Sequence, residues 1–224
     1  MLKRIIQAIY PATCILCGHS GSKDRDLCDA CAADFMENRS ACRSCAIPLA
    51  GIADQQCGQC LQKKPVYDSA WSPFLYAQPL EWIIQQIKFN SRLSYTRVLS
   101  DLMITRMPVM ARRPDCIIAV PLHVKRLTER GFNQSLEIIR PLARHLQIPV
   151  DNKSCRRKQY TLPQSGMDAK QRRKNIKGVF EFDNTKNYRH VVLFDDVITT
   201  GSTVNELSRL IKRQGVERVD VWSL

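Results

Sequence analysis

The stretch Val191–Thr203, with the sequence VVLFDDVITTGST, decides the fold of the larger part of this chain. Its first four residues are apolar, as is typical of a strand buried in the middle of a parallel sheet. Two carboxylates, Asp195 and Asp196, follow directly, and a turn of small and hydroxylated residues then leads into a helical segment. This order indicates an α/β unit, whose ligands bind at the carboxyl ends of the strands.

The chemistry of the turn predicts a ligand that carries both a phosphate and a diol. Backbone N–H groups and hydroxyls of a Thr/Gly/Ser turn can close around a phosphate, and a helix N-terminus adds its positive end. Two carboxylates would repel that phosphate unless they bind ribose hydroxyls or a cation. The combination describes a ribose 5-phosphate. A plain strand–turn–helix with a capping threonine is the alternative, but a cap does not require an acidic doublet.

The same stretch resembles the motif with which type I phosphoribosyltransferases bind phosphoribosyl pyrophosphate (PRPP). The resemblance implies that Asp195 and Asp196 hold the ribose hydroxyls. The 5-phosphate would be held by Thr199, Thr200, Gly201, Ser202 and Thr203. In that family the loop after the first core strand receives pyrophosphate, a task that suits Lys125, Arg126 and Arg130 of Pro121–Asn133. Mg²⁺ would accompany PRPP and, in a transfer reaction, stabilise the departing charge.

On either side of this stretch, strand-like and helix-like segments alternate beyond Pro65. Strands are expected at 70–76, 116–121, 150–156, 191–194 and 216–224, and helices at 80–88, 95–107, 133–146 and 205–214. The alternation predicts an α/β domain with a parallel sheet over residues 66–224. The resemblance implies that this domain has the type I phosphoribosyltransferase fold, with helices flanking the sheet.

Residues 1–65 contain a short lead helix and a cysteine-rich module. Eight of the ten cysteines form four C-x-x-C pairs: Cys14/Cys17, Cys28/Cys31, Cys42/Cys45 and Cys57/Cys60. Two such pairs complete one tetrahedral zinc site, so the pattern predicts two structural zinc ions in a double zinc ribbon-like module. The order of pairing, sequential or cross-braced, stays open. A disulfide framework is the alternative, which a reducing cytosol opposes.

The charge of the chain predicts a polyanionic partner. The 224 residues carry a net charge of +13, and residues 121–177 alone hold 14 basic and 4 acidic residues. Solubility charge on a solvated face is the alternative. A DNA-binding surface is expected at Arg156, Arg157, Lys158, Arg172, Arg173 and Lys174. No apolar run approaches the roughly 18 residues of a membrane span and no secretory signal is visible, so stable membrane insertion is not expected and a cytoplasmic location is.

Nearly the whole chain resembles the competence protein ComF family (ComF/ComFC, also grouped with GntX-like proteins). The matching features are Tyr10–Cys14 before the paired cysteines, Ile87-Lys88-Phe89, Pro121-Leu122 with Arg130-Gly131-Phe132-Asn133-Gln134, and Gln164 with Arg172–Asn175 and Gly178–Phe180. The resemblance implies a PRPP-binding protein that handles incoming single-stranded DNA in natural transformation, with other DNA-uptake or recombination proteins as further candidate partners. An active phosphoribosyltransferase on a nucleobase or related acceptor, and a non-catalytic PRPP sensor, stay as alternatives, and no catalytic residue is assigned.

Overall fold

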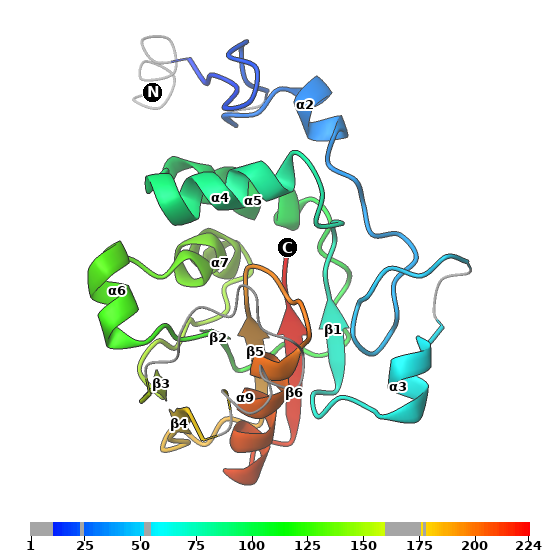
Figure 1. Ribbon diagram of the computed structural model, residues 1–224, viewed down its shortest axis with the longest axis vertical. Coiled ribbons are helices and arrows are strands. Elements are labelled where there is room, and N and C mark those ends of the chain that lie inside the picture. The colour runs from blue at the N-terminus through cyan, green and yellow to red at the C-terminus, as the bar shows by residue number, and fades with distance from the viewer. Residues whose placement is uncertain (1–10, 23–24, 52–54, 160–175, 177) are drawn as a thin grey trace.

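A four-stranded parallel sheet forms the centre of the computed structural model, which describes residues 11–22, 25–51, 55–159, 176 and 178–224 (Figure 1). The strands lie in the order β1-β6-β5-β2, with β1 at Ser69–Trp71, β2 at Cys116–Ala119, β5 at His190–Phe194 and β6 at Arg218–Trp222. The expected α/β class is therefore confirmed. The strand of the opening motif, β5, lies between β6 and β2, and all five of its residues are buried.

Helices cover both faces of the sheet. On one face lie α4 (Leu80–Asn90), α5 (Ser94–Ile104) and α7 (Gln134–His145), and on the other lies α9 (Ser202–Arg213). The alternation of side chains along β5 divides the core accordingly: Val192 and Phe194 pack with the first group, whereas Val191 and Leu193 pack with α9. Each core is thus built on one set of alternating residues from the same strand.

The capping expected at Asn133 is confirmed. Its Oδ1 accepts hydrogen bonds from the backbone N–H groups of Ser135 and Leu136, at 3.0 and 3.4 Å. Asn133 also donates from Nδ2 to the carbonyl of Val120, at 3.0 Å, just beyond the end of β2. The cap therefore fixes the start of α7 beside the carboxyl end of the sheet.

Two expected elements differ in the structure. The strand expected at 150–156 is wrong, because only Cys155–Arg157 (β3) is a strand, paired antiparallel with Phe180–Phe182 (β4) outside the main sheet. Asp151 accepts hydrogen bonds from the backbone N–H groups of Lys153 and Ser154, and this turn interrupts the extended chain. The strand expected at 70–76 ends at Trp71, shortly before Pro73.

A helix, α6 (Val124–Arg130), occupies the segment expected to be a loop between Pro121 and Asn133. His123 caps it by accepting the backbone N–H of Lys125 at Nδ1, and Gly131 ends it with a φ of 81°. No residue of α6 is buried, so the helix has no apolar face from which hydrophobic periodicity could have predicted it.

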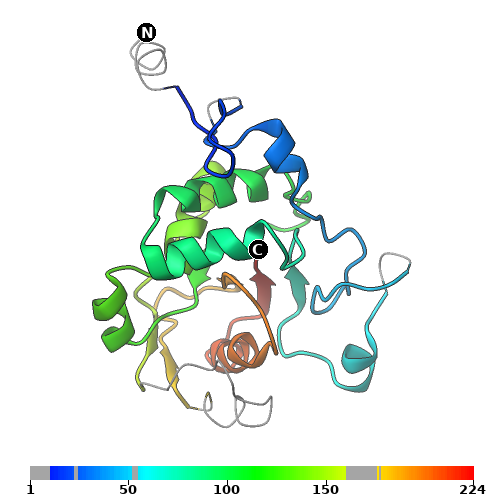
Figure 2. The same cartoon turned by 45° about the horizontal axis from the view of Figure 1, so that its top comes forward.

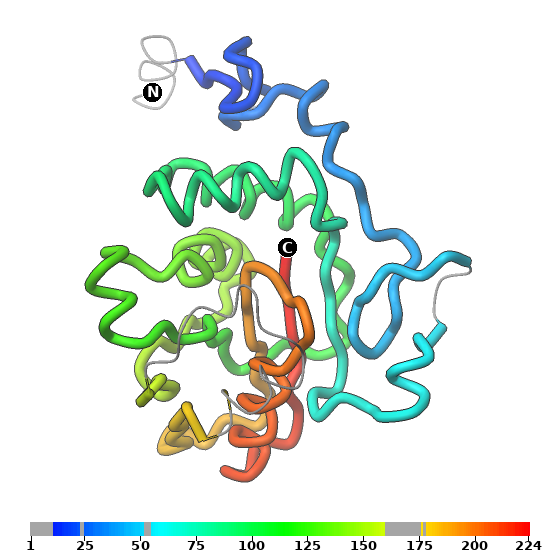
Figure 3. Tube along the Cα trace, viewed as in Figure 1, coloured from blue at the N-terminus to red at the C-terminus, as the bar shows by residue number. Residues whose placement is uncertain are grey.

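The cysteine-rich segments lie outside the α/β core and contain two short helices, α2 (Asp29–Ala33) and α3 (Gly58–Gln62). The first segment lies over α4 and α5, and the second lies beside β1 (Figures 2 and 3). Cys14 and Leu27 share one buried cluster with α4 and α5. The division of the chain at Pro65 stays a prediction, and the lead helix lies outside the described residues. Within the described part of the chain, no helix is long and apolar enough to cross a membrane.

Candidate functional site

The eight paired cysteines form two clusters of four. Cys14, Cys17, Cys28 and Cys31 make the first, and Cys42, Cys45, Cys57 and Cys60 make the second, with all sulfur atoms of a cluster within 4.8 Å of one another. The pairing is therefore sequential along the chain, and the cross-braced order is excluded. His19, close to Cys17 in sequence, is in neither cluster.

One sulfur atom of each cluster favours the thiolate form that zinc binds, whereas burial and neighbouring sulfur atoms raise the pKa of Cys31 and Cys60. Backbone N–H groups point at the favoured sulfur atoms, for example Cys57 N–H at Cys42 Sγ, 3.3 Å away. Burial alone would raise the pKa of Cys14 and Cys42, but such N–H donors outweigh it and lower the pKa of each to about 6. The donor sets fit two structural zinc ions, and four thiolates around each ion leave no open position for catalysis.

A second centre lies at the carboxyl end of β5, where Asp195 and Asp196 follow the strand. Asp195 donates its backbone N–H to the carbonyl of Trp222 on β6, at 3.1 Å. Its carboxylate Oδ1 accepts hydrogen bonds from Ser135 Oγ at 3.2 Å and from the backbone N–H of Asp196 at 3.0 Å. Ser135 stands in the first turn of α7, so the Asn133 cap positions this donor.

Asp196 is paired with a lysine from a distant helix. Its side chain is only 6% exposed, and Lys88 Nζ near the end of α4 lies 2.6 Å from its Oδ2. Oδ2 is buried, and the ammonium group of Lys88 is its partner in this structure. In the sequence, Lys88 stands out only as part of a family motif. Asp196 follows it by 108 positions, so no local pattern predicts their contact.

The two carboxylates influence each other. Burial, together with the adjacent negative charge of Asp196, raises the pKa of Asp195 above its usual range, although Lys88 and Ser135 act in the opposite direction. Hydroxyl donors or a cation bound at this site would offset the repulsion between the two carboxylates.

We expect Asp195→Asn to stabilise the unliganded protein at pH 8, where it removes the repulsion but keeps an oxygen that can accept from Ser135. Because the pKa of Asp195 is higher in the folded than in the unfolded protein, this carboxyl lowers the stability progressively as the pH rises above the unfolded pKa of about 3.9. The gain should be roughly 2–4 °C in melting temperature, as about 1 kcal/mol produces in a chain of this size. Melting curves from pH 4 to pH 8 test this, since the gain should disappear toward pH 4; a variant less stable than wild type at pH 8 would contradict it.

The turn after the carboxylates presents hydroxyls at the start of α9. Gly201 adopts a φ of 65°, a left-handed conformation that favours glycine, and its carbonyl accepts from Asn205 Nδ2 at 2.9 Å. Thr200 Oγ1 and Ser202 Oγ are hydrogen-bonded at 2.8 Å. Thr199 and Thr200 are exposed, and Thr203 lies in the first turn of α9. The turn thus presents hydroxyl groups at the start of α9, and its assignment to the 5-phosphate stays a prediction.

Two arginines lie near the carboxylates, and a third, Arg126, lies near both of these arginines. Arg130, at the end of α6, donates to Gln134 Oε1 at 2.5 Å and is close enough to Asp196 for that carboxylate to act on its pKa. The guanidinium of Arg157 lies over the ring of Phe180, 5.5 Å from its centre, and the negative charge of Asp195 acts to raise its pKa. Arg126 acts on both arginines, and burial lowers the pKa of each. The structure therefore brings Arg157, expected to bind DNA, to the same site as the predicted pyrophosphate residues.

The other predicted cations are dispersed. Lys125 is exposed on α6, Arg156 is exposed on β3, and Lys158 is paired with Glu181 of β4. Arg172, Arg173 and Lys174 lie outside the described residues. The assignment of these residues to DNA stays a prediction. Phe180, the aromatic ring beneath Arg157, is a core residue and only 6% exposed.

Comparison with known proteins gives similarity over the whole chain. Residues 5–61 match the double zinc ribbon domain family. DNA utilization protein YhgH of Escherichia coli O157:H7 is 37% identical over 226 residues, covering 96% of each chain. Competence protein F of Haemophilus influenzae is 37% identical over 220 residues, covering 94% of this chain and 95% of the relative. Competence protein ComFC of Streptococcus pneumoniae is 21% identical over 225 residues, covering 94% and 98%.

Proposed function

The chain belongs to the family of Competence protein F and DNA utilization protein YhgH, and on that premise we propose that it is a cytoplasmic PRPP-binding protein that handles single-stranded DNA. Competence and DNA utilization are the words in its relatives' names, and they support an action on DNA. The structure of the carboxylate site supports PRPP as its small ligand.

The observation that carries the PRPP proposal is the pair of adjacent carboxylates, Asp195 and Asp196, beside a turn of hydroxyl side chains. Burial and the adjacent charge of Asp196 raise the pKa of Asp195, so hydroxyl donors or a cation bound here would offset an unfavourable repulsion. Ribose hydroxyls of PRPP would donate to Asp195 and Asp196, and the hydroxyls of Thr200 and Ser202 would donate to the 5-phosphate. Arg126, Arg130 and Arg157 would face the pyrophosphate group.

The donor set also fits a hard cation. Carboxylate oxygens are the protein ligands that Mg²⁺ prefers, and this ion binds through one or two of them together with substrate phosphates. Bound Mg²⁺ would neutralise charge on the pyrophosphate group. Lys88 would hold the carboxylate of Asp196 in place before either ligand arrives.

PRPP with Mg²⁺ should raise the melting temperature, because binding to the folded state stabilises it by about 2.7 kcal/mol at a ligand concentration of 100 Kd. For this chain length that corresponds to roughly 5–10 °C. Differential scanning fluorimetry measures the shift, with Mg²⁺ and ribose 5-phosphate alone as reference ligands. Asp195→Asn/Asp196→Asn should abolish it.

Asp196→Asn removes the partner of Lys88 and could destabilise the protein for that reason alone. Asp195→Asn/Asp196→Asn/Lys88→Met removes both charges of the pair and keeps the test valid. Asp183→Asn, an exposed carboxylate beyond β4, is the matched control that should keep the full shift. A PRPP-dependent shift that survives in the folded triple variant would show that the carboxylates do not bind the ribose.

A further inference from the structure

A large cavity adjoins the turn Thr199–Thr203 that is proposed to bind phosphate. Its volume is about 810 Å³, within the range of about 300–1,000 Å³ that ligand pockets have. One wall is the segment Gln59–Tyr67 together with Cys45, so that two ligands of the second zinc cluster, Cys45 and Cys60, line the cavity. The other wall consists of α9 with Thr200 and Ser202 of the turn. The cavity therefore lies between a zinc ribbon and the PRPP site.

The charged side chains of the walls are mainly cationic. Four basic side chains line the cavity against a single carboxylate, Glu206, namely Lys63, Lys64, Arg209 and Arg213. Glu206 is already paired with Arg209, at 2.5 Å. Among the residues that the structure describes, Lys63, Lys64 and Arg213 have no ion-pair partner, and all three are exposed. Facing cations without partners favour an anionic ligand between them.

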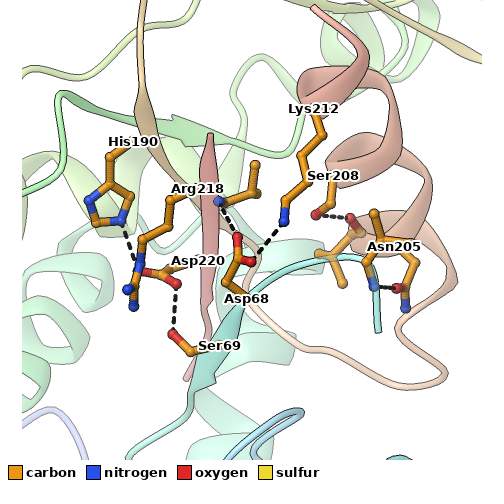
Figure 4. A network of polar contacts seen from close by, with 11 residues as sticks. Asp68, Ser69, His190, Asn205, Ser208, Lys212, Arg218 and Asp220 are labelled. Atoms are coloured by element: carbon orange, nitrogen blue, oxygen red, sulfur yellow. Dashed lines mark hydrogen bonds and ion pairs between the residues drawn. The ribbon is translucent and has the colours of Figure 1, made fainter. Parts of the chain in front are cut away.

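Hydrogen bonds and an ion pair join the two segments that form the walls (Figure 4). The backbone N–H of Val66 donates to Asn205 Oδ1 at 2.8 Å, and Asp68 accepts from Lys212 Nζ at 2.8 Å and from the backbone N–H of Val219 at 2.8 Å. Binding therefore does not have to order the wall that carries Lys63 and Lys64, which lowers its entropic cost.

Asn205 also connects this wall to the phosphate-binding turn. While its Oδ1 accepts from Val66, its Nδ2 donates to the carbonyl of Gly201 at 2.9 Å. Thr200 and Ser202 line the cavity and are joined by their own hydrogen bond. One turn thus forms part of the cavity and, on the proposed function, part of the PRPP site.

We infer that this cavity binds a short segment of single-stranded nucleic acid, with its phosphates on Lys63, Lys64 and Arg213. The inference rests on the proposed function for its ligand class but assigns the binding site to a surface outside residues 121–177. The amides of Gln59 and Gln62 offer hydrogen bonds to unpaired bases. A cavity of about 810 Å³ has room for single nucleotides. Because the turn is shared, PRPP and the strand change each other's affinity by the same factor.

The test is binding of dye-labelled oligothymidine, measured by fluorescence anisotropy over a range of salt concentrations. Lys63→Glu/Lys64→Glu/Arg213→Glu should weaken binding at least about tenfold and reduce the salt slope by about 2, since each phosphate contact on a single strand contributes about 0.7. The matched control is Arg97→Glu/Arg112→Glu/Arg144→Glu, which changes the net charge equally at exposed sites outside the cavity. Lys63→Arg/Lys64→Arg should retain binding, and added PRPP should shift the wild-type affinity.

Equal weakening by both triple variants would overturn the inference and leave only a general charge effect. Weakening by Arg156→Glu/Arg157→Glu/Lys158→Glu, with no effect of the cavity variant, would locate the DNA elsewhere and leave the proposed function standing. If the cavity variant loses zinc but keeps its affinity for oligothymidine, its lysines only balance the thiolate charge of the neighbouring cluster, and the inference falls. If the wild-type protein binds no oligothymidine, the inference and the DNA part of the proposed function both fall, whereas the PRPP thermal shift stands separately.

Discussion

Cys42→Ser should lower the zinc content from two ions per chain to one and unfold the second ribbon. The sequential clusters share no ligand, so the first zinc ion should stay bound. Structural zinc sites supply roughly 10–16 kcal/mol of apparent binding free energy, far more than the few buried apolar side chains of this ribbon can replace. Elemental analysis gives the stoichiometry, and amide hydrogen exchange shows which residues lose protection.

The loss of protection should be confined to residues 41–60, because the α/β core has its own two buried clusters. His19→Ser is the matched control and should keep both ions, since His19 belongs to neither cluster. Cys14→Ser should reduce the melting temperature of the whole protein more than Cys42→Ser, because Cys14 lies in the buried cluster of α4 and α5. Two zinc ions in purified Cys42→Ser would contradict the assignment of ligands.

Asp220→Ala should be the most destabilising single change within the sheet. This buried carboxylate on β6 accepts from Ser69 Oγ at 2.7 Å, His190 Nε2 at 2.8 Å and Arg218 Nε at 2.9 Å (Figure 4). The residue connects all three neighbouring strands β1, β6 and β5, and its loss leaves their donors without an acceptor. Breaking a buried charged pair costs roughly 3–5 kcal/mol, which corresponds to about 6–20 °C in melting temperature.

The loss should also depend on pH. Burial alone would raise the pKa of Asp220, but the hydrogen bonds from His190, Arg218 and Ser69 outweigh it and lower that pKa. A lowered folded pKa means that the stabilisation is complete above the unfolded pKa of about 3.9 and is lost as the pH falls further. Urea unfolding at pH 7 and pH 3 measures both effects. Asp183→Ala is the exposed control, and an Asp220→Ala variant as stable as this control at pH 7 would show that the network does not stabilise the sheet.

Features that depend on neighbouring residues were predictable from the sequence. The apolar run of β5, the carboxylates after it and the hydroxyl-rich turn before α9 are consecutive in the chain, so their order alone indicates a ligand site at a strand end. The C-x-x-C spacing predicted two zinc sites because a tight turn already brings two thiolates together. Asn133 capped α7 as expected because its bonds reach only the next few residues.

Tertiary structure alone decided what depends on distant contacts. The pairing order of the cysteine pairs, the ion pair of Lys88 with Asp196 and the approach of Arg157 to Asp195 join segments whose separation the sequence does not encode locally. Helix α6 has no buried face, so its position follows from its His123 cap and from Gly131 without a hydrophobic pattern. The cavity beside α9 exists because Asn205 and Lys212 hold Val66 and Asp68, more than 130 residues away in the chain. Local sequence patterns determine which chemistry a segment can offer, whereas packing between distant segments determines which of these groups meet.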